Sequence, residues 1–199
     1  MPKVKQFKEV EALEKVTDLF WKKGYSATSM QDIVSHLGLS RSSIYDTFTD
    51  KETLFHKSLD FYIQDSCAKL TTYLEQVLNN ERDAREFIQG LLDSMTQESL
   101  NDPDRRGCFV TNSTAECFNY KDKTAQLLAL NRDLITTILT KAIVHGQQMG
   151  SIKSKTPAAV LASYLFTFFN GLRIATRIGD GDTDLFKQSV NLAMRALDT

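Results

Sequence analysis

Cysteine, proline and net charge are all scarce in this chain of 199 residues. Its three cysteines form an odd number at irregular spacing, which excludes a framework of paired disulfides and the regular ligand pattern of a zinc site. The formal net charge of -1 excludes a generally cationic nucleic-acid binder, so any contact with DNA must depend on locally placed charge. The histidines at positions 36, 56 and 145 are scattered, and we expect neither a metal nor another cofactor.

Long hydrophobic runs are absent as well. The longest largely apolar stretch, residues 164–169, falls far short of the roughly 20 residues that a membrane-spanning helix needs. The first residues, MPKVKQFKEVEALEK, are too polar for a secretory signal. We therefore expect a cytoplasmic protein with reduced thiols and no membrane segment, large enough to bury a core without crosslinks.

Helical periodicity fills most of the chain, and the three prolines and nine glycines fall where helices would end. The pattern predicts a first helix over about residues 7–23, with an inward face of Val10, Leu13, Val16, Phe20 and Trp21. Further helices are expected over residues 29–37, 41–48, 51–80, 83–100, 109–118, 123–149, 156–179 and 183–197. No strand-like alternation of useful length appears, so the predicted fold class is all-α with about nine helices.

Residues 28–48 predict a helix-turn-helix unit. Thr28 and Ser40 are expected to cap two short helices separated by Gly38. In such a unit the second helix enters the major groove of DNA and presents its first residues to base edges. The start of that helix, Ser40–Ser43, combines small serines with an arginine that can pair with guanine. The spacing alone leaves open a purely structural helix pair that never touches DNA.

The run LFWKKGYSATSMQDIVSHLGLSRSSIYDTFTDKETLF resembles the DNA-binding domain of the TetR family of bacterial transcriptional repressors. The matching features are GY at 24–25, TSM at 28–30, DI at 32–33, and LGLSRSSIYDTF ahead of DKETLF. The resemblance implies a helix-turn-helix DNA-binding domain over residues 1–50 and a helical effector-binding and dimerisation domain over residues 51–199. It implies phosphate or backbone contacts from Thr28, Ser40, Lys51 and the Tyr45 hydroxyl, base contacts from Arg41 and Ser42, and a place near the groove for Ser43.

One position departs from that pattern. Many relatives carry a tyrosine and a histidine before the phenylalanine of the second helix, where this chain has Asp46 and Thr47. A phosphate would repel Asp46 unless its carboxylate points away, caps a helix, or accepts from a cytosine amino group. We expect a local structural role for Asp46.

The resemblance also implies a homodimer. The two C-terminal long helices, residues 156–179 and 183–197, would pack against their copies as a four-helix interface. The first of them is apolar almost all round, which suits burial against both its own core and a partner. A twofold dimer matches a palindromic operator. The alternative is a monomer in which this helix is simply core.

The segment GCFVTNSTAECFNY at 107–120 and the run GLRIATR at 171–177 resemble a subgroup of the family with a glycine-cysteine-apolar run and an N-x-x-x-E pattern. Some repressors of that subgroup sense electrophiles or oxidants through this cysteine. Cys108, with Cys117, is therefore a candidate switch whose thiol pKa Arg105 and Arg106 would lower, or else a small core residue. The other candidates for lining an effector pocket are Phe61, Met95, Phe109, Phe118, Phe166, Phe169 and Arg173, each of which can equally be core.

No catalytic pattern stands out, and Asp102, Asp104 and Glu116 look like caps and solvated surface. The sequence therefore predicts a regulator and not an enzyme. We expect a repressor that a small-molecule effector or cysteine modification releases from its operator. A helical module that acts through protein partners is the alternative. Effector binding would shift the balance between two dimer geometries, with the helix that begins at Lys51 as the moving part.

Overall fold

The computed structural model describes residues 9–80, 82–116, 123–178 and 183–199, and within these ranges every regular element is helical. The α-helices are α1 (Glu9–Lys23), α2 (Met30–Leu37), α3 (Arg41–Phe48), α4 (Lys51–Leu78), α5 (Ala84–Asn101), α6 (Phe109–Glu116), α7 (Lys123–Met149), α8 (Ala158–Ala175) and α9 (Thr183–Met194), and a 3-10 turn (Arg195–Leu197) follows. The all-α prediction is confirmed, and the expected boundaries lie within a few residues of those observed.

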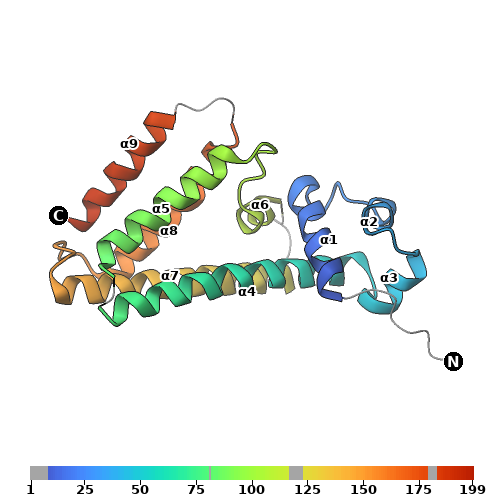
Figure 1. Cartoon of the computed structure of the whole chain (residues 1–199), viewed down its shortest axis with the longest axis horizontal. Coiled ribbons are helices and arrows are strands. Elements are labelled where there is room, and N and C mark those ends of the chain that lie inside the picture. The colour runs from blue at the N-terminus through green and yellow to red at the C-terminus, as the bar shows by residue number, and fades with distance from the viewer. Residues whose placement is uncertain (1–8, 81, 117–122, 179–182) are drawn as a thin grey trace.

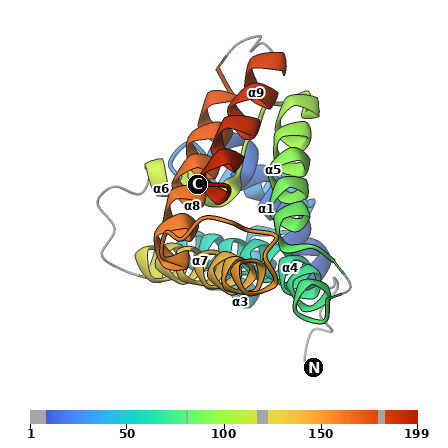
Figure 2. The same ribbon diagram turned by 90° about the vertical axis from the view of Figure 1, so that its left-hand side faces the viewer.

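The molecule is elongated, with α1, α2 and α3 gathered at one end (Figure 1). The long helix α4 starts there and runs along the molecule with α7 beside it, while α5, α8 and α9 stand over the far half (Figures 1 and 2). The most extensive helix packing joins α4 to α7 and α7 to α8, and α1 packs on the first part of α4. The helix α4 thus contacts both halves of the molecule.

The start of α2 differs by one residue from the expectation. Ser29, not Thr28, caps this helix: its hydroxyl accepts from the Asp32 amide, and the Asp32 carboxylate accepts from the Ser29 amide. This reciprocal pair satisfies two helix-end donors at once. The Thr28 hydroxyl is buried and instead donates to the Gly24 carbonyl at 2.6 Å.

The α1–α3 end of the chain is built around a shared apolar core. Its fully buried members come from all three helices and from the start of α4: Val16, Phe20, Ile33, Ile44, Phe48, Leu54 and Phe55. Val10, expected in the α1 face, is 56% exposed. The buried residues of α1 begin at Ala12, and Val10 lies ahead of them in the first turn of the helix.

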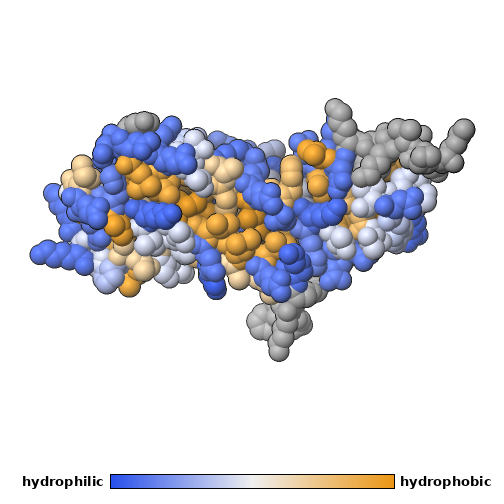
Figure 3. Space-filling model, turned by 90° about the horizontal axis from the view of Figure 1, so that it is seen from below, coloured by the Kyte–Doolittle hydropathy of each residue, from blue (hydrophilic) through white to orange (hydrophobic). Residues whose placement is uncertain are grey.

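The most apolar helix is only partly covered. Among the described helices, only α8 is long and apolar enough to cross a membrane. A single helix of this kind is weak evidence for a membrane span. Of this segment, 28% is buried inside the chain. Val160, Tyr164 and Ile174 are among its exposed side chains. A further apolar area lies over the middle of the face seen from below, where α4 and α7 run (Figure 3). The single chain therefore leaves considerable apolar surface in contact with water.

Candidate DNA-binding surface and sensor cavity

The helix α3 holds two opposite rows of side chains. Ile44 and Phe48, one turn apart, are buried in the core. Ser42 and Asp46 are displaced from that row by about 200° around the helix, and both are exposed. Because α3 lies at the end of the molecule remote from the C-terminus (Figure 1), this outward row faces away from the rest of the chain.

The serines at the start of α3 form one local network. The Ser40 hydroxyl caps the helix by accepting from the Ser43 amide, and it lies 3.0 Å from the Ser42 hydroxyl and 2.8 Å from that of Ser43. Arg41 is exposed and its guanidinium lies 5.8 Å from the ring centre of Tyr45, itself 39% exposed. The structure therefore places these five predicted DNA contacts together at the surface.

Lys51 and Thr28 have partners within the chain. The Lys51 ammonium donates to the carbonyls of Tyr25 and Thr28, both at 2.9 Å, and lies 4.1 Å from the centre of the Tyr25 ring. These contacts tie the start of α4 to the loop between α1 and α2. One ammonium proton of Lys51 remains for a phosphate, whereas the Thr28 hydroxyl would have to leave its carbonyl partner. Both phosphate contacts stay predictions.

A second polar site surrounds Cys108, directly before α6. The Arg173 guanidinium donates to the Cys108 sulfur at 3.2 Å, and the Tyr62 hydroxyl lies 3.9 Å from it. Burial disfavours the thiolate, but Arg173, Thr111 and Tyr62 outweigh it, so the pKa of Cys108 lies below its ordinary value. Burial and the adjacent Cys108 charge raise the pKa of Tyr62, which keeps this phenol protonated. Burial raises the pKa of the other described cysteine, Cys67.

Cys108 lies between two cavities, of about 390 Å³ and 50 Å³. Met95, Cys108 and Arg173, all expected near an effector, line both, together with Tyr62, which sequence reasoning missed. Phe166 and Phe169 line the smaller one. Phe61 and Phe109 line neither cavity. The Phe109 ring instead packs against the rings of Phe55 and Tyr62. Cys117 and Phe118 lie outside the described residues.

The cation beside the thiol is not the expected one. The Arg106 guanidinium pairs with Asp18 at 2.7 Å and Asp102 at 3.0 Å, and it stacks 4.3 Å from the centre of the Trp21 ring. Burial would raise the pKa of Asp102, but hydrogen bonds from the Arg106 amide and guanidinium hold it below its usual value. The prediction that Arg105 and Arg106 activate Cys108 is wrong, because Arg106 is drawn to these carboxylates and Arg173 occupies the place beside the sulfur.

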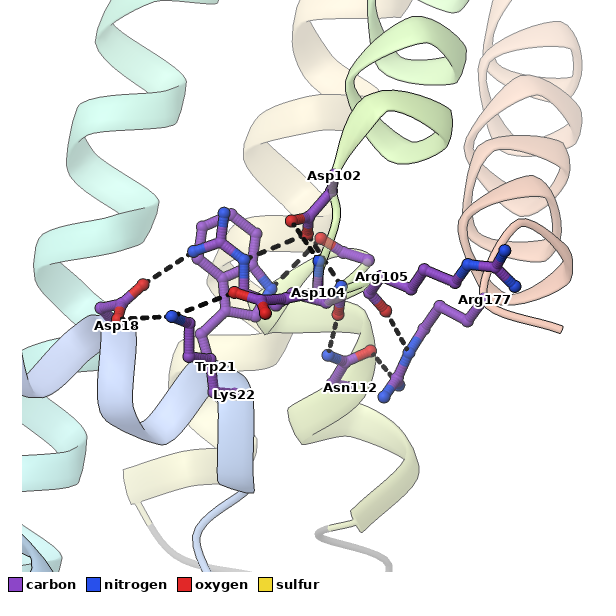
Figure 4. A network of polar contacts seen from close by, with 10 residues as sticks. Asp18, Trp21, Lys22, Asp102, Asp104, Arg105, Asn112 and Arg177 are labelled. Carbon is purple, nitrogen blue, oxygen red and sulfur yellow. Dashed lines mark hydrogen bonds and ion pairs between the residues drawn. The ribbon is translucent and has the colours of Figure 1, made fainter. Parts of the chain in front are cut away.

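These contacts join the loop before Cys108 to α1 (Figure 4). Besides the Arg106 pairs, Lys22 pairs with Asp104 at 3.0 Å, and the Trp21 indole donates to the Gly107 carbonyl at 3.2 Å. Asp104 raises the pKa of Lys22 by accepting its hydrogen bond. We call residues 102–107 and their α1 partners the α1 seam.

The N-x-x-x-E pattern, Asn112 and Glu116, lies on α6 and holds two parts of the chain together. The Asn112 amide donates to the Arg106 carbonyl and accepts from Arg177. The Glu116 carboxylate accepts from the amides of Tyr25 and Ser26, at 3.0 and 2.6 Å, in the loop before α2. Glu116 is exposed, as expected of solvated surface, but its carboxylate also anchors this loop.

Comparisons with known proteins decide the family. Residues 13–57 match the model for bacterial regulatory proteins of the tetR family. The uncharacterised regulator YezE of Bacillus subtilis is 25% identical over the full length of both chains. The Escherichia coli repressor ComR is 28% identical over 89% of this chain and 82% of its own. Residues 13–57 form a DNA-binding domain of the TetR family.

Solved TetR-family structures share the fold. A cysteine-substituted form of the regulator CifR, in complex with a 26-bp operator duplex, has a TM-score of 0.80 at 23% identity and covers 99% of both chains. Reduced NemR of E. coli has a TM-score of 0.83 at 15% identity, over 92% of this chain and 93% of that one. The chain is a TetR-type helix-turn-helix transcriptional regulator and not an enzyme. Its described residues include no cluster of side chains suited to a metal ion.

Proposed function

We propose that the chain is a cytoplasmic repressor that binds a palindromic operator as a homodimer and that chemistry at the Cys108 cavity releases it. The observation that carries this proposal is the outward row of α3, held at the tip of the molecule by Ile44 and Phe48 in the core. Arg41, Ser42 and Tyr45 would read or brace the major groove, with Ser40, Ser43, Lys51 and Thr28 in support. We propose the domain division after Asp50, where α4 begins.

The second subunit would cover α8 and α9. The exposed positions of α8 form one uncharged stripe at helical spacing, comprising Val160, Tyr164, Thr167, Gly171 and Ile174. On α9, Leu185, Ser189 and Leu192 form a matching row. A stripe of apolar and small residues lets two helices approach closely, and burying it in a twofold interface removes the apolar surface from water.

The Cys108 cavity suits a small electrophile. The Arg173 guanidinium stabilises the thiolate, which is the nucleophilic form of cysteine. Addition of the sulfur to an electrophilic carbon would form a neutral thioether and leave Arg173 without its anion. A reversible ligand with an anionic or carbonyl oxygen would compete with the thiolate for the same guanidinium.

The change at Cys108 can reach the DNA-binding helices along two contacts. Cys108 directly precedes α6, whose last residue, Glu116, holds the loop before α2. The loop segment of the α1 seam, residues 102–107, ends one residue before Cys108. We propose that modification displaces α6 and this loop, and that α4, which packs on α1, moves with them. The modified dimer would then hold its two α3 helices at a spacing that no longer fits the operator.

Selection of bound sequences from random DNA tests the DNA-binding part. We expect one palindrome with half-sites about one helical turn apart, or a multiple of it. Treating the full-length protein with N-ethylmaleimide should lower its affinity for that palindrome, measured by fluorescence anisotropy. Cys108→Ser should abolish this response and the control Cys67→Ser should keep it. Enrichment of no sequence contradicts operator binding, and an unchanged affinity after complete alkylation contradicts the cysteine switch alone.

A further inference from the structure

Asp46 is an exposed carboxylate in the middle of α3 that the packing of the chain does not explain. It makes no hydrogen bond or ion pair with any residue in the described ranges. It does not cap its own helix either, because the Ser40 hydroxyl caps the start of α3. A local structural role, expected from the sequence, therefore has no contact to support it.

The position of Asp46 is that of a groove-facing residue. It stands one turn after Ser42 in the row opposite Ile44 and Phe48, so it points away from the core that holds α3 in place. The recognition helix of a helix-turn-helix lies in the major groove with its solvent-facing side toward the bases. Ser42 is small, which leaves room for the neighbouring carboxylate to approach a base edge.

We infer that Asp46 is a specificity-determining residue that accepts a hydrogen bond from the exocyclic amino group of a cytosine in the operator. This inference rests on the proposed operator binding. An ionised carboxylate only accepts hydrogen bonds, and the amino groups of cytosine and adenine are the donors that bases present in the major groove. On adenine the amino group lies beside the N7 acceptor, whose lone pair repels a carboxylate. On cytosine the neighbouring group is a C–H, which does not.

The carboxylate would also act against wrong sequences. Opposite any base edge without an amino donor, Asp46 would lose its hydration and gain no hydrogen bond, while still repelling the phosphates. Specificity then arises from the cost on non-cognate DNA as much as from the contact with cytosine.

Selection from random DNA with full-length variants tests this role. The wild-type protein should enrich cytosine at one symmetry-related pair of operator positions. Asp46→Ala should lose the preference at that pair alone. Asp46→Asn should shift it toward adenine, whose amino group and N7 match an amide. Replacing the selected C·G pair by T·A should weaken wild-type binding roughly ten- to hundredfold and Asp46→Ala binding less than about threefold.

Glu52→Gln is the matched control, because it removes one exposed negative charge from the start of α4 without touching α3. It should keep every base preference, although all three variants that lose a negative charge should bind random DNA more tightly. If the selected operator is the same for wild type, Asp46→Ala and Asp46→Asn, the role of Asp46 is wrong. Equal loss of preference at all positions likewise overturns it, whereas a wild-type protein that enriches no sequence contradicts operator binding itself.

Discussion

At the scale of single residues, one arginine dominates the chemistry of the Cys108 cavity. Cys67 and Cys108 are both buried, yet the pKa of Cys67 is raised and that of Cys108 is lowered. The difference is the Arg173 guanidinium 3.2 Å from the Cys108 sulfur, because a nearby cation offsets the loss of hydration of a thiolate. Burial alone would have raised the pKa of both thiols.

We expect Arg173→Gln to raise the pKa of the Cys108 thiol. Without the guanidinium, burial prevails, and the midpoint of the alkylation rate against pH should move upward. The measurement is the rate of iodoacetamide modification of Cys108, followed by mass spectrometry from pH 5 to 10. Arg177→Gln, which removes a guanidinium bound to Asn112 rather than to the sulfur, should leave the midpoint in place. Equal midpoints for wild type and Arg173→Gln would refute this role of Arg173.

Thr49, between α3 and α4, has a strained backbone. Its φ of +69° and ψ of -57°, with the Asp50 amide donating to the Phe48 carbonyl at 2.7 Å, describe a tight γ-turn of the rare positive-φ kind. A β-branched residue is unfavourable there. The turn sets the angle between α3, the proposed recognition helix, and α4. The strain therefore lies next to the proposed DNA-binding surface.

Thr49→Gly should therefore stabilise the protein by about 1 kcal/mol, since glycine relieves more strain than its added chain entropy costs. Urea unfolding followed by circular dichroism measures this change. The same substitution inside α3, Thr47→Gly, should be destabilising because position 47 has ordinary helical geometry. A loss of stability in Thr49→Gly would show that the threonine contributes contacts that exceed its strain.

At the scale of elements, α6 is the shortest link between cavity and recognition domain. Cys108 precedes its first residue, and Glu116 at its end holds the loop between α1 and α2. The loop before it forms the α1 seam, and Gly107 there has a φ of +67° and would place a Cβ 2.7 Å from Arg177. A side chain at position 107 would therefore be both strained and crowded.

Glu116→Ala should weaken the response of the protein to alkylation. The substitution removes the acceptor of the Tyr25 and Ser26 amides. Because these amides are exposed, water can take the place of the carboxylate, and the free energy of unfolding should fall by less than about 1 kcal/mol. The operator affinity of the unmodified protein should change little. Modification of Cys108 should then lower that affinity severalfold less than it does in the wild-type protein. The measurement is operator binding before and after N-ethylmaleimide, with Glu86→Ala, an exposed glutamate of α5, as the control. A full response in Glu116→Ala would exclude α6 as the link.

At the scale of the whole molecule, the proposed dimer makes the α8 stripe essential for operator binding. Ile174→Arg places a charge at the C-terminal end of that stripe, where Ile174 is 48% exposed in the single chain. We expect monomers by analytical ultracentrifugation and operator affinity lower by roughly a hundredfold or more, because the two half-sites then bind separately. Val144→Arg, at an exposed position of α7, should remain dimeric. A dimeric Ile174→Arg protein would place the interface elsewhere.

Acid should unfold the molecule through its capping carboxylates. Lys23 and Ser29 lower the pKa of Asp32, and the Thr53 amide and hydroxyl lower that of Asp50. A carboxyl whose folded pKa is depressed contributes stability above its unfolded value near 4 and loses it as the pH falls further. The urea midpoint should therefore drop most steeply below about pH 4. Asp32→Asn should flatten this slope, and an unchanged slope would contradict the assignment.

The sequence predicted the helices, their order and the recognition helix because these depend on local periodicity and on a contiguous motif. It missed the partners of Cys108 and Glu116, since Arg173 lies 65 residues from the cysteine and Tyr25 lies 91 residues from the glutamate. Spacing along a chain identifies neighbours one turn apart and says nothing of contacts at such separations. For Asp46 the helical spacing was visible, but which row faces the core depends on how Ile44 and Phe48 pack.

By itself, then, the sequence determined an all-helical chain with a helix-turn-helix near its start, because apolar spacing and helix caps act within a few residues. Only the tertiary structure decided which arginine activates the thiol, which carboxylate anchors the recognition domain and which side of α3 is free. Those outcomes depend on competition among charges from distant segments. Arg106 and Arg173 have the same side chain, but only Arg173 lies beside the sulfur, because Asp18 and Asp102 hold the other.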